Sequence, residues 1–316
     1  MTANVCDLCE GLMKRIVMAG AALTLVAAAS LGLVAQSSTP PPRQLHANGV
    51  ELSYIEQGTG TPVVFVHGAV GDLRFWEPQR AAFTRRHRFV SYSYRYHGPA
   101  PWPDDGKQYS AATHAADLAA FIPALKAGPV HLVGLSYGGL LGTMVATKHP
   151  ELIRTLTLAE PATFSLLAET PEGKPALDEW MKSAAPMMAA VKAGDSLTAT
   201  KMLVAVVNGQ PIDGFDFEKV PPGLRQVLLD NARTMPLLFS APPAAVSCAE
   251  LRTVKAPTLV VRGERTPQFF AKINELAGRC IPGSRELVVP EAAHVMSWDN
   301  PAAFNRAVLD FIAQQR

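Results

Sequence analysis

The sequence predicts an α/β fold in which a mostly parallel sheet is covered by helices on both faces and carries a helical insertion. Three observations lead to this prediction. Apolar, β-branched runs alternate with helical patterns over residues 61–159, and again from residue 258 to the C-terminus, as parallel strands with crossover helices do. A Gly-x-Ser-x-Gly motif joins one such strand to the helix after it. Residues 161–242 interrupt the alternation.

The composition is that of a globular protein and limits its partners. Of the 316 residues, 48% are hydrophobic and 18% are charged, so the chain can bury a large core. The net charge is +2 and there is no basic run, which argues against nucleic acid as a partner. The sequence contains no metal-ligand cluster, phosphate-binding loop or dinucleotide-binding motif. We therefore expect a small-molecule substrate and no metal or cofactor.

Residues 1–42 are predicted to be a targeting segment and linker ahead of the folded domain, which we place at residues 43–316. Lys14 and Arg15 precede an apolar run over residues 16–35, and a polar, proline-rich linker follows. This layout is typical of a secretory signal peptide. The run also approaches the length that spans a bilayer, so an uncleaved N-terminal anchor is the alternative. We expect an exported protein, periplasmic or secreted, which meets a membrane only if this segment is retained.

The four cysteines fall into two pairs. Cys6 and Cys9 lie in the targeting segment without a second ligand pair, which makes them poor candidates for a metal or redox site. Cys248 and Cys280 lie on either side of one predicted strand, so we expect both near the same end of the sheet. In an oxidising compartment they can form a disulfide. The sequence leaves this disulfide and two buried free thiols as alternatives.

The first half of the domain is predicted to alternate strands and helices. It begins with a hairpin over residues 43–56 that turns at Asn48-Gly49, a strong turn signal. A strand at residues 61–66 then runs into a glycine-containing loop at residues 67–71. The elements expected after this loop are a helix at 73–83, a strand at 88–94, a helix at 111–125, a strand at 130–135, a helix at 141–147 and a strand at 153–159.

The second half begins with the insertion, residues 161–242, which is rich in Ala, Met and Leu. We interpret it as a helical lid. Its expected helices are near residues 176–192, 197–207 and 223–235. The α/β pattern resumes with a strand at 258–262, a helix at 267–279 and a strand at 286–289. A last helix is expected from Pro301, because Asn300 just ahead of it is a good N-cap.

The Gly-x-Ser-x-Gly motif spans Gly134 to Gly138 and is predicted to form a nucleophile elbow. An apolar strand precedes the motif and a helix follows it, the context in which this motif holds a serine on a sharp, strained turn. Gly134 and Gly138 would let neighbouring backbone pass close by. The Oγ of Ser136 would then stand above the sheet as the nucleophile, with the N–H of Tyr137 directed at a developing oxyanion.

Four motifs in order make the chain similar to the α/β-hydrolase superfamily, and most similar to its branch of esterases, enol-lactonases and C–C bond hydrolases of ring-cleavage products. These motifs are Val64-Phe65-Val66-His67-Gly68, Arg95-Tyr96-His97-Gly98, Gly134-Leu135-Ser136-Tyr137-Gly138-Gly139 and Ala293-His294. The resemblance covers the chain from about Val50 onward except for the lid, and it implies the α/β-hydrolase fold. It also implies that His294 is the base and that the N–H groups of Ala69 and Tyr137 form the oxyanion hole. We expect structural roles for the His67 and His97 side chains.

The triad acid departs from the common family pattern. Most members carry an Asp in a Gly-Glu-x-Asp turn after the penultimate strand, but here the turn reads Gly263-Glu264-Arg265-Thr266. Glu160 follows the strand after the elbow helix, the position from which some branches, such as the haloalkane dehalogenases, take their acid. We predict Glu160 as the acid. Glu264 as a displaced substitute, and a structural Glu160 without any working acid, are the alternatives.

The predicted function is that of a serine hydrolase that cleaves a small, mostly apolar carboxylic ester or lactone through an acyl-enzyme. Ser136 would attack, His294 would move the proton and Glu160 would orient His294. C–C bond hydrolysis of a diketone-like substrate uses the same triad and is one alternative. A binding or sensing protein with little turnover on the same scaffold is another, because Thr266 stands where most members carry their acid.

Overall fold

One eight-stranded sheet organises residues 39–315, the part of the chain that the structure, a computed structural model, describes. The strand order is β1-β2-β4-β3-β5-β6-β7-β8. The first two strands pair antiparallel around Asn48-Gly49, as predicted, and β2 also pairs antiparallel with β4. The other neighbouring strands are parallel. The strands are β1 (Arg43–Ala47), β2 (Val50–Gln57), β3 (Pro62–Val66), β4 (Arg88–Tyr92), β5 (Val130–Leu135), β6 (Ile153–Ala159), β7 (Thr258–Gly263) and β8 (Arg285–Val289).

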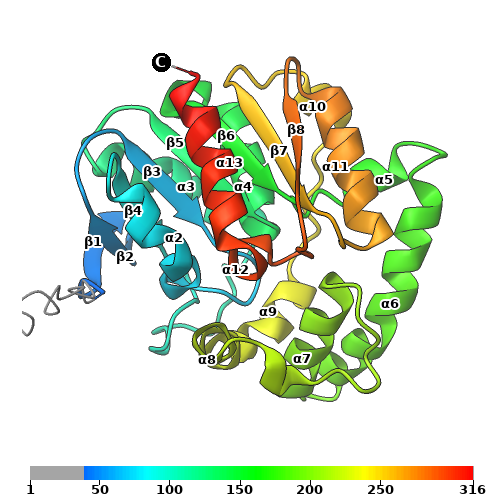
Figure 1. Ribbon diagram of the computed structural model, residues 1–316. Coiled ribbons are helices and arrows are strands. Elements are labelled where there is room, and N and C mark those ends of the chain that lie inside the picture. The colour runs from blue at the N-terminus through cyan, green and yellow to red at the C-terminus, as the bar shows by residue number, and fades with distance from the viewer. Residues whose placement is uncertain (1–38, 316) are drawn as a thin grey trace, which may run out of the picture. The chain divides into compact units, whose positions relative to one another are not determined.

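Helices cover both faces of this sheet, which confirms the predicted fold class (Figure 1). On one face α2 (Glu77–Phe83) packs against α13 (Pro301–Ala313). On the other face lie α3 (Ala111–Ala124), α4 (Tyr137–Lys148) and α11 (Gln268–Cys280). Each face has its own apolar core. Every residue of β3 and β5 is buried, which explains their nearly continuous apolar sequences.

The helical insertion lies between β6 and β7, and most of its helices gather at one end of the sheet (Figure 1). The expected helix at residues 223–235 is divided in the structure, because α8 ends at Asn231 and α9 begins at Met235. Pro236 lies in the first turn of α9, where its missing N–H costs no hydrogen bond. The helices of the insertion are α5 (Ser165–Ala168), α6 (Lys174–Lys192), α7 (Ser196–Val207), α8 (Pro222–Asn231) and α9 (Met235–Ser240).

Proline also explains a second difference from the prediction. The expected helix at residues 73–83 begins as a 3-10 turn, Leu73–Trp76, and only then becomes α2. Pro78 lies in the first turn of α2, where its missing N–H costs nothing, whereas an α-helix running through it would lose a hydrogen bond. At the other end of the domain, Asn300 caps α13 by accepting the N–H of Ala303, as predicted.

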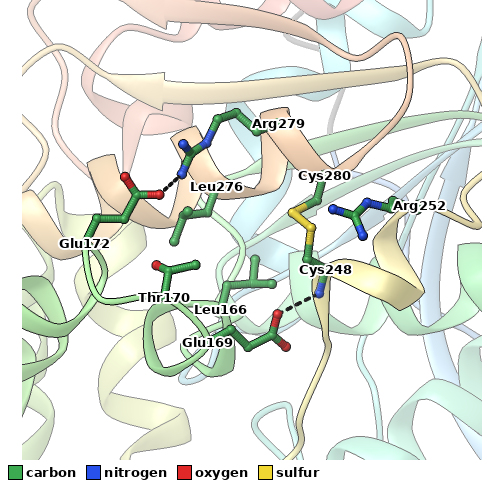
Figure 2. Close-up of a pocket in the computed structure, with 9 residues that line it drawn as sticks. All are labelled: Leu166, Glu169, Thr170, Glu172, Cys248, Arg252, Leu276, Arg279 and Cys280. Carbon is green, nitrogen blue, oxygen red and sulfur yellow. Dashed lines mark hydrogen bonds and ion pairs between the residues drawn. A yellow bond between two sulfur atoms is a disulfide. The ribbon is translucent and has the colours of Figure 1, made fainter.

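Cys248 and Cys280 form a disulfide, which answers the question that the sequence left open (Figure 2). It joins the short helix α10 (Cys248–Leu251) to the last residue of α11. The two cysteines are 32 residues apart, and closing a loop of that length restricts the unfolded chain by about 3–4 kcal/mol on the chain-entropy estimate. The disulfide therefore holds the C-terminal end of α11. On the same helix, Phe270 lines a cavity that Ser136 also lines.

The predicted signal peptide or anchor, including Cys6 and Cys9, lies outside the described residues. Within residues 39–315, none of the helices combines the length and the apolar character needed to cross a membrane.

Candidate active site

Ser136 occupies the sharp turn between β5 and α4. Its backbone has φ of 54° and ψ of −119°, a conformation that non-glycine residues rarely adopt and that is common at functional sites. The backbone around it holds this turn, because the N–H of Ser136 donates to the carbonyl of Ala159 over 2.9 Å and its own carbonyl accepts the N–H of Ala162 over 2.9 Å. Ser136 is partly exposed. Its Oγ makes no hydrogen bond to the described part of the chain, and it opens onto a cavity.

The glycines of the motif allow backbone to pack on backbone. A Cβ on Gly138 would lie 2.2 Å from the carbonyl oxygen of Val66 and 2.5 Å from that of His67. A Cβ on Gly134 would lie 2.4 Å from the carbonyl oxygen of Gly138. No side chain fits at either position, as predicted. The backbone of the elbow therefore packs directly against the end of β3 and the loop that follows it.

Glu160 and His294 meet although they lie 134 positions apart in the chain. Glu160 directly follows β6 and His294 lies in the loop after β8. The Nδ1 of His294 is 2.6 Å from the Oε2 of Glu160, while the Oε1 of Glu160 accepts the N–H of Gly263 over 2.8 Å. Glu160 is 0% exposed and His294 is 4% exposed. A carboxylate without a proton only accepts hydrogen bonds, so in that state of Glu160 the Nδ1 of His294 is the donor and Nε2 is left with its lone pair.

Glu264, the alternative carboxylate, is placed differently. Glu264 is exposed, and its Oε2 accepts the N–H of Glu291 over 2.8 Å. Thr266, at the position where the family pattern predicts an Asp, has its Oγ1 buried without a hydrogen-bond partner among residues 39–315. Of the two candidate carboxylates, Glu160 is the one that hydrogen-bonds to His294.

Phe270 contacts His294 and also lies at the cavity of Ser136. Its ring stacks on the imidazole of His294, with centroids 4.1 Å apart and an interplanar angle of 11°. Phe270 also lines the cavity onto which Ser136 opens. The sequence did not single out Phe270, because an apolar residue on the buried face of a helix carries no signal that distinguishes a site wall from core.

The cavity at Ser136 has a volume of about 290 Å³. Ala69 and Tyr137, the predicted oxyanion donors, both line it. No charged side chain lines it. The insertion contributes much of its wall through α6, α7 and α9, namely Trp180, Leu203, Val207, Leu238 and Phe239. The structure therefore brings Ser136, Ala69 and Tyr137 to one apolar cavity, and Phe270 links this cavity to the Glu160–His294 pair.

The loop of residues 67–71 lies directly against the elbow. A Cβ on Gly68 would be 3.5 Å from the Cβ of Ser136. His67 and His97 are buried and bond to the loop's own carbonyls, with each Nδ1 2.8 Å from its partner, Gly68 for His67 and Gly71 for His97. Burial lowers the pKa of His67 to about 4 and lowers that of His97 as well. These contacts agree with the structural roles expected for the two histidines.

Other cavities do not include Ser136. One of about 310 Å³ lies beside the disulfide, where Glu172 pairs with Arg279 and Glu169 accepts the N–H of Cys248 (Figure 2). Three of the charged side chains at this cavity, Glu169, Glu172 and Arg279, are thus engaged with each other or with backbone. Another cavity, of about 340 Å³, is lined mostly by residues of the insertion, together with Ala293 and Val295 on either side of His294. Charged side chains are among its lining residues, namely Asp216, Lys219, Arg265 and Asp299. Within the described range, His, Cys, Asp and Glu side chains form no group that could hold a metal ion.

The chain is similar to several known hydrolases. It is 27% identical over 282 residues to a 2-(acetamidomethylene)succinate hydrolase of Mesorhizobium japonicum, which covers 85% of this chain and 94% of that protein. It is 26% identical over 277 residues to a 2-hydroxy-6-oxo-6-(2'-aminophenyl)hexa-2,4-dienoic acid hydrolase of Metapseudomonas resinovorans, covering 86% and 91% of the two chains. An esterase of Exiguobacterium antarcticum superimposes with a TM-score of 0.70 at 21% identity, over 86% of this chain and 100% of that one.

The family comparison agrees with the fold and with the elbow geometry. Residues 61–301 match the family described as the alpha/beta hydrolase fold. This range is more than half of the chain and contains the elbow, Glu160 and His294. The chain therefore belongs to the alpha/beta hydrolase fold family.

Proposed function

We propose that the protein is a serine hydrolase that cleaves a neutral, mostly apolar carboxylic ester or lactone through an acyl-enzyme. The observation that carries this proposal is the uncharged cavity at Ser136. The hydrogen-bonded Glu160–His294 pair supports it, because a serine hydroxyl needs a base to become a nucleophile. A binding protein with little turnover would need an idle Glu160, whereas this carboxylate is engaged with His294.

The proposed reaction begins when the Nε2 of His294 takes the proton of Ser136 Oγ and Oγ attacks the substrate carbonyl. The buried carboxylate of Glu160 stabilises the imidazolium that forms. The oxyanion of the tetrahedral intermediate accepts the N–H groups of Ala69 and Tyr137. Tyr137 is the first residue of α4, so its N–H has no partner within the helix and lies at the positive end of the helix dipole.

The second half of the reaction repeats these roles with water. His294 first returns the proton to the departing alcohol oxygen, which breaks the ester bond and leaves the acyl group on Ser136. Water then gives a proton to Nε2 and attacks the acyl carbonyl, which releases the acid and restores Ser136. Each oxyanion donor of this kind typically contributes about 10²–10³ in rate.

The uncharged cavity favours neutral substrates over the substrates after which the two relatives are named. Both of those names denote carboxylic acids, a substituted succinate and a dienoic acid. Burying a carboxylate without a partner is strongly unfavourable, and the cavity offers no cation to pair with it. C–C bond hydrolysis remains the alternative, provided that the diketone-like substrate places no charged group in this cavity.

This selectivity can be tested with two substrates of similar size. We expect kcat/KM for p-nitrophenyl butyrate to exceed that for the mono-p-nitrophenyl ester of succinate by about 100-fold or more, equivalent to about 3 kcal/mol for an unpaired buried charge. Methylating the free carboxylate of the succinate ester removes the charge and should restore most of the rate. Equal rates for the charged and neutral substrates would contradict the proposed substrate class.

We also propose that the protein is exported, and that the N-terminal segment is a signal peptide or, if retained, a membrane anchor. The Cys248–Cys280 disulfide supports this, because disulfides persist in oxidising compartments. We further propose that the insertion acts as a lid over the acyl group, since its helices form much of the cavity wall.

A further inference from the structure

We propose that Tyr94 is a positioning residue for the oxyanion hole, because its phenolic O–H holds the peptide group between Gly68 and Ala69 in place. This inference rests on the proposed function, since it takes the N–H of Ala69 as one of the oxyanion donors. The sequence did not single out Tyr94. It lies just beyond the end of β4, beneath the loop of residues 67–71.

The contacts of one carbonyl carry the inference. The carbonyl oxygen of Gly68 accepts the O–H of Tyr94 over 2.8 Å and the N–H of Gly71 over 3.1 Å. The Nδ1 of His67 lies 2.8 Å from the same oxygen. A carbonyl cannot donate a hydrogen bond, so this Nδ1 carries the proton. Three donors from different directions therefore fix the orientation of a single C=O group.

Fixing this C=O group also fixes the oxyanion donor. A peptide group is planar, and in its trans form the N–H points opposite to the C=O. No cis peptide bond occurs among the described residues. The N–H of Ala69 belongs to the same peptide group as the Gly68 carbonyl, so it points away from Tyr94 and His67. Ala69 lines the cavity beside Ser136 and Tyr137, where the substrate oxyanion would form.

The surroundings keep both side chains in their donating forms. Tyr94 is 0% exposed, and burial raises its pKa well above the usual range, so its O–H stays protonated. The His67 ring stacks on Tyr94 with centroids 4.0 Å apart. With a pKa of about 4, His67 is neutral at pH 7 and still donates through Nδ1. Its Nε2 is buried without a hydrogen-bond partner in the described range, so the ring is held there at the cost of an unsatisfied polar atom.

Tyr92 provides a matched control for Tyr94. It is the last residue of β4, two positions earlier in the chain, and it is also 0% exposed. Its hydroxyl is buried without a hydrogen-bond partner among residues 39–315. Tyr92→Phe and Tyr94→Phe thus remove the same atom from neighbouring, fully buried sites, but only Tyr94→Phe removes a hydrogen bond to the Gly68 carbonyl.

We expect Tyr94→Phe to lower kcat for p-nitrophenyl butyrate about tenfold, with KM changed less than twofold. The loss falls on kcat because the oxyanion contact forms only in the transition state. It is smaller than the 10²–10³-fold typical of losing a donor outright, because the N–H itself remains. Tyr92→Phe should keep kcat and KM within twofold of wild type. Inhibition by an alkyl trifluoromethyl ketone, whose adduct carries an oxyanion, should weaken in Tyr94→Phe by about the same factor as kcat/KM.

A second variant tests the same peptide group by another route. A Cβ on Gly71 would lie 3.0 Å from both the Cβ and the Nδ1 of His67, so Gly71→Ala should push the ring away from the Gly68 carbonyl. We expect the same fall in kcat with little change in KM. Circular dichroism and thermal unfolding show whether each variant is folded. The displaced His67 ring is the one that stacks on Tyr94, so an unchanged kcat in a folded Gly71→Ala variant overturns the inference even if Tyr94→Phe does not fold.

The outcomes separate this inference from the proposed function. Ester turnover by wild type, combined with a Tyr94→Phe variant that behaves like Tyr92→Phe, overturns the role of Tyr94 alone. A rise in KM at constant kcat also overturns it, because a loosened oxyanion donor cannot produce that pattern. Absence of both turnover and fluorophosphonate labelling in folded wild type overturns the proposed function, and the role of Tyr94 falls with it.

Discussion

Glu160→Gln is expected to lower kcat for ester hydrolysis about 10³–10⁴-fold, with KM changed little and the fold retained. Glutamine has the same length, and its carbonyl can still accept the N–H of Gly263, as Oε1 of Glu160 does. It carries no charge to stabilise the imidazolium of His294. Its amide can also present an N–H to Nδ1, which favours the tautomer with the proton on Nε2 and so removes the base. Steady-state kinetics with p-nitrophenyl butyrate measure this loss.

Glu264→Gln is the control for this experiment. Glu264 accepts a backbone N–H and is exposed, so its neutral variant should keep kcat within about twofold of wild type. The reverse pattern, an active Glu160→Gln and an inactive Glu264→Gln, would move the acid to Glu264. If both variants were fully active, neither carboxylate would serve as the triad acid.

Gly138→Ala is expected to remove most activity and to destabilise the protein by about 3 kcal/mol or more. The new Cβ would lie 2.2 Å from the carbonyl oxygen of Val66 and 2.5 Å from that of His67. Both contacts are with backbone, so relief requires the elbow and the loop of residues 67–71 to separate. This movement displaces Ser136 and Tyr137 from Ala69, the other proposed oxyanion donor, and we expect kcat to fall at least 100-fold. Chemical denaturation and steady-state kinetics measure the two effects.

Gly142→Ala is the matched control, because Gly142 lies one turn later in the same helix. There the new Cβ would meet only side-chain atoms, Leu132 Cδ2 at 3.3 Å and Leu156 Cδ1 at 3.5 Å. Replacing glycine by alanine inside a helix gains up to about 1 kcal/mol from helix propensity in both variants. Gly142→Ala should therefore stay within about 1 kcal/mol of wild type and remain active. Similar losses in both variants would mean that the backbone contacts of Gly138 are not the cause.

Much of the fold follows from local sequence patterns. Parallel strands buried on both faces, such as β3 and β5, must be apolar almost throughout, so they stand out from amphipathic helices. The helix breaks just before Pro78 and Pro236 differ from the prediction because the apolar periodicity does not mark them. Each proline lies in the first turn of the helix that follows the break. The periodicity reports which residues face the core but not where the hydrogen-bond ladder stops. Proline favours a break without imposing one, since α6 continues through Pro186.

The site was predictable only where a residue type is chemically distinctive. Ser136 and His294 stand in motifs, but the choice between Glu160 and Glu264 depends on which carboxylate reaches His294 across β6 and β7. This depends on the tertiary structure, in which Glu160 hydrogen-bonds to His294. Tyr92 and Tyr94 look alike in the sequence and are equally buried. They differ only in the partner of the hydroxyl group, which no local pattern encodes. Pairing of Cys248 with Cys280 likewise depends on how α10 and α11 pack.

The most direct test of the central claim is fluorophosphonate labelling of the mature protein and its Ser136→Ala variant, with p-nitrophenyl butyrate hydrolysis measured on the same samples. An activated serine at position 136 predicts that wild type is labelled and turns over ester, and that the folded variant does neither. Labelling and turnover that persist in Ser136→Ala would place the nucleophile elsewhere. A folded wild type that shows neither would contradict a serine hydrolase acting through Ser136.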